Sequence, residues 1–196
     1  MRKVDFARKT AETDIKGSLC LDGKGVYKIN TGCGFFDHMT ELFAKHGSFD
    51  LVLECDGDLR VDGHHTVEDC GIVLGKAFKD ALGEKKGINR YGSFIMPMDE
   101  ALVLVALDIS GRCYLNFDVT FPDEYKLGDM DAELPAEFFA SFTRSAEVTL
   151  HVKKIYGSNN HHVCEAVFKG FARALKQAVS VDIKNKDVLP STKGVL

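Results

Sequence analysis

The chain contains an internal repeat, and this repeat restricts its fold more than any other feature of the sequence. Each copy has, in the same order, a short helical segment, an extended run, a His-His-x-x-Glu motif and a long helical segment. The motifs lie at 64–68 and 161–165. Four parts in the same order indicate a duplicated unit. We therefore predict an α+β fold of two similar halves, each a mixed β-sheet with helices packed on one face.

Hydrophobic spacing predicts which segments of each copy form helices and strands. Helical spacing indicates helices at 37–46, 66–82 and 163–179, and a further helix beginning near Glu137. Extended apolar runs predict strands at 49–55, 102–107, 113–119 and 148–153. The Asp-Gly-Lys-Gly sequence at 22–25 predicts a hairpin, and Gly47 predicts a helix C-cap.

Composition and charge exclude several classes of protein. The 196 residues fit one large domain or two small ones, and the net charge of −4 with scattered Lys and Arg argues against nucleic-acid or membrane binding. No segment is long enough to span a bilayer, and the charged N-terminus lacks the apolar stretch of a signal peptide, so we expect a cytoplasmic protein. The six cysteines include no C-x-x-C pair and are expected to be buried or idle thiols.

Histidines gather at matching points of the repeat. Five of the seven lie there: His38, His64, His65, His161 and His162. Imidazole and carboxylate groups are ligands for manganese, iron, zinc and related ions. If a motif lies on the first helical turn, its first His and its Glu project from one face, whereas adjacent histidines diverge by about 100°. Each motif therefore serves two different ions, and two copies predict a two-metal site.

The two motifs suggest a hypothesis for how the ligands divide between the ions. One ion would take His64, Glu68 and His162, the other His161, Glu165 and His65, and His38 and its repeat equivalent Glu137 would complete the sets. Mixed nitrogen and oxygen ligands favour an octahedral ion such as manganese over a closed tetrahedral zinc site. The alternative is a surface histidine cluster or a set of helix caps. Because two motifs stand at equivalent positions of the repeat, this is the minority interpretation.

Longer segments resemble a known enzyme family. They lie at 8–13, 34–39, 62–69, 97–101, 108–112, 149–151, 160–169 and 190–194, and in this order they resemble the imidazoleglycerol-phosphate dehydratases over nearly the whole chain. The resemblance implies a single domain, 1–196, with a fold like ribosomal protein S5 domain 2 and repeats of about 1–92 and 93–196. It also implies a lyase that dehydrates D-erythro-imidazoleglycerol phosphate to imidazoleacetol phosphate in L-histidine biosynthesis.

The resemblance further implies the cofactor, the assembly and the ligands. Members of this family carry two Mn²⁺ ions per active site and form a hollow 24-subunit homo-oligomer with active sites between subunits. Metal ligands are expected at His38, His64, His65, Glu68, Glu137, His161, His162 and Glu165. Some members have His at the position of Glu137.

Substrate-binding positions follow from the same resemblance. A phosphate monoester needs an anion clamp, and the family's clamp matches Arg90, Arg112, Lys169, Ser191 and Lys193. Glu12 matches a glutamate that contacts the substrate, and Leu42 stands where relatives usually carry Gln near the substrate. Asp37 and Asp99 are expected to orient neighbouring groups, and His46 and His151 to be structural.

The reaction that the resemblance implies gives the catalytic residues their expected roles. The hydrogen that is lost is poorly acidic, so the substrate's imidazole ring must act as an electron sink, and metal coordination favours its imidazolate form. The imidazolate then expels the hydroxyl through a diazafulvene-like intermediate. We expect Glu165 to take the carbon-bound proton, Glu68 to act as a related acid, base or ligand, and His65 to be catalytic as well as a ligand.

Two other functions stay open at the level of the sequence. A binuclear metallohydrolase such as a phosphatase would share the metals and the clamp, but it would release phosphate instead of forming an enolisable ketone. A metal-storage assembly would bind well over two metals per chain. The Arg, Lys and Ser positions of the clamp argue against storage.

Overall fold

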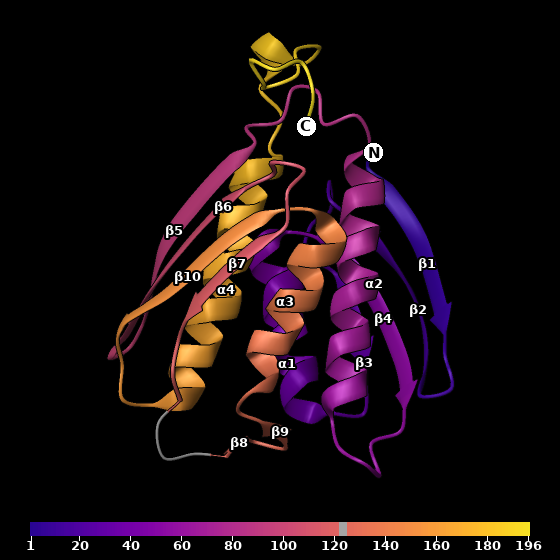
Figure 1. The fold of residues 1–196 in the computed structure, drawn as a ribbon, viewed down its shortest axis with the longest axis vertical. Coiled ribbons are helices and arrows are strands. Elements are labelled where there is room, and N and C mark those ends of the chain that lie inside the picture. Colours follow the sequence, from indigo (N-terminus) through magenta and orange to yellow (C-terminus); the bar gives the residue numbers. More distant parts are fainter. Residues whose placement is uncertain (122–124) are drawn as a thin grey trace.

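Two four-stranded sheets form the outer sides of the molecule, and four helices lie between them (Figure 1). The computed structural model describes residues 1–121 and 125–196. In the described part of the chain, no helix is both long enough and apolar enough to cross a membrane. The arrangement buries one face of each sheet against the helices, which is the usual way for such elements to share a core.

The first half of the chain forms one sheet and two helices. Its strands are β1 (Lys3–Lys9), β2 (Thr13–Cys20), β3 (Tyr27–Asn30) and β4 (Asp50–Gly57), and its helices are α1 (Gly34–Gly47) and α2 (His64–Leu82). The strand order is β1-β2-β4-β3. Strands β3 and β4 are parallel, and the other neighbours are antiparallel.

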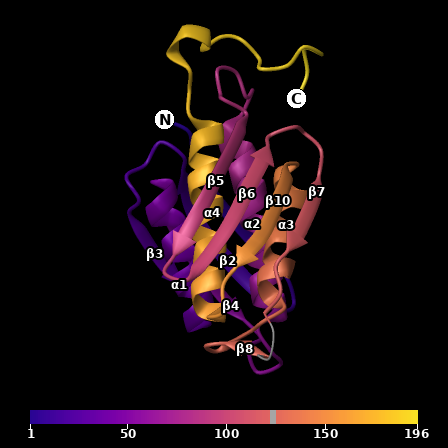
Figure 2. The same cartoon turned by 90° about the vertical axis from the view of Figure 1, so that its left-hand side faces the viewer.

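The second half repeats this topology. Its strands are β5 (Tyr91–Met98), β6 (Ala101–Asp108), β7 (Tyr114–Asp118) and β10 (Thr149–Tyr156), and its helices are α3 (Leu134–Ala146) and α4 (Asn160–Val179). The order β5-β6-β10-β7, visible in Figure 2, again places the one parallel pair at the edge. The predicted duplicated α+β fold is therefore confirmed. Two short strands, β8 (Lys126–Leu127) and β9 (Met130–Asp131), and a 3-10 helix, η1 (Ile183–Asn185), have no counterpart in the first half.

The core lies between the sheets and is rich in phenylalanine. Strand β6 shows why each sheet buries one face, since Val103 and Val105 are buried while the alternate residues are partly exposed. Helices α3 and α4 contribute fully buried rings, and Phe139 packs on Phe168 and Phe171 with ring centroids 5.0 and 5.1 Å apart. These aromatic contacts fix the helix layer that carries the candidate site.

The two halves meet through their helices, which pair in parallel. Helix α1 lies beside α4, with Lys176 Nζ donating to Ser48 Oγ near their C-terminal ends, and α2 lies beside α3. Gly71 and Gly75 allow α2 and α3 to approach closely, because a Cβ at Gly75 would lie 2.5 Å from the Phe142 carbonyl oxygen. All four helices begin at the end of the molecule where β8 and β9 lie (Figure 1). The repeat histidines, which lie near the starts of the helices, therefore come to this end.

The hairpin predicted at 22–25 is wrong. Strands β2 and β3 flank these residues but do not pair, because β4 lies between them in the sheet. The turn is held by β4 instead, since the Asp50 carboxylate accepts hydrogen bonds from the backbone N–H groups of Lys24 and Val26 at 2.8 and 2.9 Å. A turn signal in the sequence gives no information about which strand lies beside the next one.

Helix boundaries differ from the predicted ones at several points. Helix α2 begins at His64 and α4 at Asn160, so both histidines of each motif lie on the first helical turn. Gly47 is the last residue of α1, and Ser48, with φ of 56°, is the C-cap. A Cβ at position 47 would lie 2.3 Å from the Phe49 ring, which explains why glycine is needed there.

The cysteines are free thiols, and most are inside the protein. Four are buried, Cys55 is half-buried and Cys113 is exposed. The expectation of buried thiols therefore holds for four of the six, and Cys113 is exposed because it lies in the turn before β7.

Candidate metal centre

Three side chains from both halves converge at the helix N-termini. His38 on α1, His161 and Glu165 on α4 each offer a ligand atom, and these atoms lie within 4.8 Å of one another. Glu165 Oε1 is 2.9 Å from His38 Nε2 and 3.1 Å from His161 Nε2. Among the described residues, no second set of three His, Cys, Asp or Glu ligand atoms converges to this degree. The cluster joins the first half to the second.

Local contacts at the helix starts hold these side chains in place. The Asp129 carboxylate, in the turn between β8 and β9, accepts from the backbone N–H groups of Gly34 and Phe35 at 2.7 and 2.8 Å. It therefore takes the place of an N-cap for α1. The Phe35 ring then packs edge-on against His161, with centroids 5.1 Å apart. The start of α1 is thus fixed against the start of α4.

Charge at the cluster is balanced by a lysine one helical turn along α4. Lys169 Nζ forms a short ion pair with Glu165 Oε2 and also lies 3.3 Å from Met98 Sδ. Burial raises the pKa of Glu165, but hydrogen bonds from Lys169, His38 and His161 outweigh it and lower that pKa to about 2. The carboxylate is therefore charged at neutral pH, as a metal ligand must be.

The second histidine of each motif points away from the first, as the helical spacing predicts. The rings of His64 and His65 have centroids 6.2 Å apart at 87°, and those of His161 and His162 are 6.2 Å apart at 85°. His65 Nδ1 contacts both Asp58 oxygens at 3.0 and 3.1 Å. His65 and His162, the second histidines of the motifs, lie outside the His38 cluster.

His162 has a carboxylate partner of the same kind. Its Nδ1 lies 2.7 Å from Glu100 Oε2. This hydrogen bond raises the pKa of His162, and the bond to Asp58 raises that of His65. In both rings, Nδ1 is occupied and Nε2 is the nitrogen left for another ligand.

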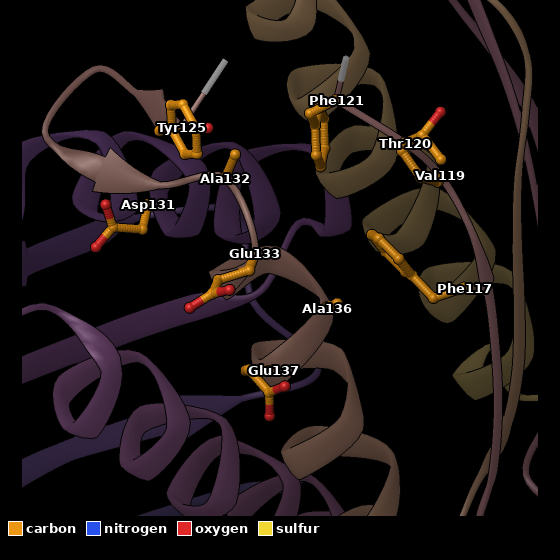
Figure 3. A pocket seen from close by; sticks show the side chains of 10 residues that line it. All are labelled: Phe117, Val119, Thr120, Phe121, Tyr125, Asp131, Ala132, Glu133, Ala136 and Glu137. Carbon is orange, nitrogen blue, oxygen red and sulfur yellow. The ribbon is translucent and has the colours of Figure 1, made fainter. Parts of the chain in front are cut away.

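The repeat equivalent of the cluster is more open. His64, Glu68 and Glu137 lie at the matching points of α2 and α3, but they do not converge in the same way. The Glu68 carboxylate is 3.8 Å from Arg144, and Glu137 lines a pocket of about 540 Å³. Figure 3 shows Glu137 and Glu133 on the α3 side of this pocket, with Phe117 on the β7 side.

The observed grouping agrees with one part of the predicted division of ligands and differs from another. His161 and Glu165 lie together and are joined by His38, so side chains from both halves come together. His65, which was expected beside His161 and Glu165, lies outside the cluster and contacts Asp58. The reason is that α2, which carries His65, packs beside α3 and not beside α4.

Most of the predicted phosphate clamp lies at the opposite end of the molecule. Arg90 forms a double contact with Asp108, at 2.7 and 3.1 Å, and donates to the Pro190 carbonyl oxygen at 2.9 Å. Ser191 and Lys193 follow in the same tail, at the C-terminal end in Figure 1. Arg112 directly follows Gly111, and the Gly111 backbone packs against Leu196 at the end of that tail.

A long distance therefore separates the clamp from the cluster within one chain. The Arg90 N–H donates to the carbonyl oxygen of Ala178, in the last turns of α4, whereas His161 lies in the first turn. At 1.5 Å per residue the two ends are about 25 Å apart. Lys169 is the exception among the clamp residues, since it lies beside Glu165. Glu12 is also at the cluster end, with Oε1 3.7 Å from His65 Nε2.

The remaining predicted positions have ordinary surroundings. Asp37 accepts from the backbone N–H and the hydroxyl of Thr31, at 2.8 and 2.6 Å, and so orients the loop before α1. Burial, followed by the charge of nearby Lys169, lowers the pKa of His46. His151 is exposed on β10, with its ring 5.5 Å from that of Tyr114.

Several residues of the site were not expected from the sequence. The Glu165–Lys169 pair has the i, i+4 spacing that favours an ion pair on a helix, so this contact could have been found. Asp58, Glu100 and Asp129 carry no such signal. Asp58 lies seven residues before His65 in an irregular turn, and Glu100 reaches His162 from another turn of the same half. Asp129 reaches the start of α1 only because the two halves pack together.

The fold and the donor set define a class of protein. A duplicated α+β chain with two His-His-x-x-Glu motifs at neighbouring helix N-termini belongs with enzymes that carry a histidine- and carboxylate-ligated metal site. Two imidazole nitrogens and one carboxylate oxygen fit a divalent transition metal such as Mn²⁺ or Fe²⁺.

Comparison with known proteins identifies the family within this class. A family profile described as imidazoleglycerol-phosphate dehydratase matches residues 31–175. The enzyme of this name from Acetivibrio thermocellus is 60% identical over 195 residues, covering 100% of this chain and 99% of the relative. The one from Caldicellulosiruptor saccharolyticus is 57% identical over 195 residues, covering 100% and 98%.

A solved structure agrees with the sequence comparisons. The crystal structure of imidazoleglycerol-phosphate dehydratase from Staphylococcus aureus subsp. aureus N315 superposes with a TM-score of 0.83 at 39% identity, and the match covers 92% of this chain and 99% of that one. The chain belongs to the imidazoleglycerol-phosphate dehydratase family.

Proposed function

We propose that this chain dehydrates D-erythro-imidazoleglycerol phosphate to imidazoleacetol phosphate in L-histidine biosynthesis. The observation that carries the proposal is the convergence of His38, His161 and Glu165 at the helix N-termini in a chain of this family. A lyase that uses the substrate's imidazole ring as an electron sink needs a metal-type donor set of this kind.

The metal ligands form two sets related by the duplication. Two Mn²⁺ ions would be held by the eight residues His38, His64, His65, Glu68, Glu137, His161, His162 and Glu165. The ions, when bound, would lower the pKa of the substrate's imidazole ring and stabilise its charge. The convergence of His38, His161 and Glu165 supports one ion. The sequence repeat, which places His64, Glu68 and Glu137 at the equivalent positions, is the support for a second.

Glu165, Glu68 and His65 are the catalytic residues in this proposal. Glu165 accepts the carbon-bound proton, and Glu68 acts as the related acid, base or ligand. The ion pair with Lys169 keeps Glu165 charged but weakly basic, so proton transfer requires this pair to open. Lys169 is also a clamp residue, and a substrate phosphate would draw its ammonium group away from Glu165.

The substrate site is shared between chains. Arg90, Arg112, Ser191 and Lys193 are too far from the cluster for a substrate with a glycerol-sized chain to reach both in one molecule. The clamp of one copy must therefore meet the cluster of another, with Glu12 contacting substrate hydroxyls. This supports a homo-oligomer with sites between subunits, which we propose to be the 24-subunit particle.

Mixed assemblies test the sharing. His161→Ala removes a ligand, and Arg112→Ala removes a clamp residue, so each pure oligomer should be nearly inactive. When the two variants are dissociated and assembled together, about one site in four receives both intact parts, and activity should return. Mixtures as inactive as the pure variants would show that each site belongs to one chain.

A metal-reconstitution assay tests the function itself. Metal-stripped protein is incubated with imidazoleglycerol phosphate before and after Mn²⁺ is added back. We expect an enolisable ketone to form only with the metal. Release of inorganic phosphate would instead indicate the hydrolase, and binding of many more than two metals per chain without turnover would indicate storage.

The six cysteines are consistent with a protein that functions in a reducing compartment. All are free thiols, and we propose a cytoplasmic location for this biosynthetic enzyme. A small-molecule phosphate and other copies of the chain are its proposed partners.

A further inference from the structure

Asp58 and Glu100 occupy the same place relative to the two motifs, although they come from different turns. Asp58 follows β4 and contacts Nδ1 of His65, the second histidine of the first motif. Glu100 precedes β6 and contacts Nδ1 of His162, the second histidine of the second motif. In each case a carboxylate accepts a hydrogen bond from Nδ1–H and leaves the Nε2 lone pair free. A carboxylate behind a histidine in this way fixes its tautomer and ring orientation for a metal.

Backbone hydrogen bonds hold both residues in place. Glu100 Oε1 accepts a hydrogen bond from the Asn159 N–H at 2.8 Å. Asn159 is the N-cap of α4, and its side chain accepts from the His162 N–H. The Asp58 N–H donates to the Glu12 carbonyl oxygen at 3.1 Å. Among the described residues, the carboxylate nearest to His162 Nε2 is that of Asp99, at 3.9 Å, and the one nearest to His65 Nε2 is that of Glu12, at 3.7 Å, so neither is at hydrogen-bond distance.

The duplication shows that the two halves reach this arrangement differently. Glu12 and Glu100 are equivalent, since each directly precedes the second strand of its sheet. Glu100 contacts Nδ1 of its histidine, whereas Glu12 lies on the Nε2 side of His65. The connection between β4 and α2 is longer than that between β10 and α4, and it supplies Asp58. The shorter connection, residues 157–159, includes no carboxylate.

We propose that Asp58 and Glu100 are positioning residues for the metal centre, each presenting Nε2 of its histidine to an ion. By taking Nδ1 of His65, Asp58 frees the Glu12 carboxylate for the substrate, so the equivalent residues Glu12 and Glu100 have different roles. The inference rests on the proposed metal-dependent function.

Substitution of Asp58 tests this role. Asp58→Ala removes the acceptor and keeps the backbone bonds, and Asp58→Asn keeps one acceptor oxygen. Asp56→Ala is the matched control, because Asp56 is an exposed carboxylate two residues away on β4. Titration of each metal-stripped protein with Mn²⁺ should show affinity about 10- to 100-fold weaker for Asp58→Ala at one of the two sites. Asp58→Asn should recover part of this loss, and Asp56→Ala should match the wild type.

A second measurement needs no metal. The ring ¹⁵N shifts of His65 in the metal-free chain report which nitrogen carries the proton. We expect Nδ1–H in the wild type and a shift toward Nε2–H in Asp58→Ala, with the unfolding midpoint unchanged. Glu100→Gln should shift the His162 tautomer in the same direction. Glu12→Gln should raise KM without weakening Mn²⁺ binding.

The outcomes separate the two proposals. Wild-type protein that binds no Mn²⁺ would overturn the proposed function, while the His65 tautomer would still test the positioning role. Wild type and Asp58→Ala with equal Mn²⁺ affinity and the same His65 tautomer would overturn the positioning role alone.

Discussion

His38 Nε2 on α1 lies 2.9 Å from Glu165 Oε1 on α4, although the two residues are 127 positions apart in the sequence. One residue comes from each half of the duplication. The site is therefore complete only when the halves are docked, and its geometry depends on how α1 packs beside α4. This dependence gives each residue of the cluster a measurable effect.

Replacement of Glu165 by Gln should separate chemistry from folding. The amide has nearly the same shape but carries no charge, so it is a poor ligand and a poor proton acceptor. We expect turnover to fall about 100-fold or more, with an unchanged circular dichroism spectrum. Glu54→Gln, on the outer face of the first sheet, is the control and should retain wild-type turnover. Near-normal turnover of Glu165→Gln would remove the residue from the catalytic set.

Acid should weaken the metal-free protein through Glu165. Its pKa is lowered from 4.5 to about 2 in the folded chain, so the unfolded chain binds a proton first as the pH falls. The stabilising contribution is fully present above about pH 4.5 and is lost as the pH approaches 2. Urea unfolding across this range should show falling stability.

Lys169→Met is the matched variant for the acid experiment. Without the ammonium group, the pKa of Glu165 rises toward its ordinary value, because the hydrogen bond from Lys169 is the largest of the effects that lower it. The free energy of unfolding of this variant should therefore depend less on pH below about 4.5. Identical pH slopes for the variant and the wild type would assign the acid sensitivity to other carboxylates.

Much of the fold could be predicted from the sequence because its signals are local. The spacing of Val163, Val167 and Phe171 indicates the buried face of α4, and the repeat indicates that two halves share a topology. Strand order is not local. The turn at 22–25 has the residues of a hairpin, yet the flanking strands do not pair. Helix α1 leads the chain back to the sheet, and β4 then lies between β2 and β3.

The site was predictable to the extent that helix geometry determines it. His161 and Glu165 share a face because they are four residues apart, and His161 and His162 diverge because they are adjacent. The choice of His38 as their partner depends on which helices pack together. The separation of Arg90 from the cluster is a property of the whole chain, since it is set by the length of α4.

Lys193→Ala should affect substrate binding more than metal binding. Lys193 lies with Ser191 in the C-terminal tail, which Arg90 contacts at the Pro190 carbonyl oxygen, about 25 Å along α4 from the cluster. Loss of one charge-assisted contact to phosphate costs about 1.5–3 kcal/mol, which corresponds to roughly a 10- to 100-fold rise in KM. Mn²⁺ affinity should not change. Lys184→Ala, in the same tail, is the control, and an equal rise in KM for it would show that the effect is general charge loss.

Gly75→Ala should destabilise the protein even though alanine favours helices. A methyl group at this position would lie 2.5 Å from the Phe142 carbonyl oxygen and 2.9 Å from Ser145 Cβ, so α2 and α3 must move apart. Alanine gains about 1 kcal/mol of helix propensity over glycine, whereas forced overpacking typically costs about 1–3 kcal/mol. Because the closest neighbour is a backbone oxygen that cannot move alone, we expect the cost of overpacking to exceed the gain. We expect a lower free energy of unfolding by denaturant.

The same substitution should affect the two halves of the metal centre unequally. Separation of α2 from α3 moves His64 and Glu68 away from Glu137, while α1 and α4 keep His38 beside Glu165. Mn²⁺ titration of Gly75→Ala should therefore show one weakened site and one unchanged site. Lys76→Ala, at an exposed position of the same helix, should leave stability and both sites as in the wild type. If Gly75→Ala weakened both sites equally, the two ligand sets would not be anchored to separate helix pairs.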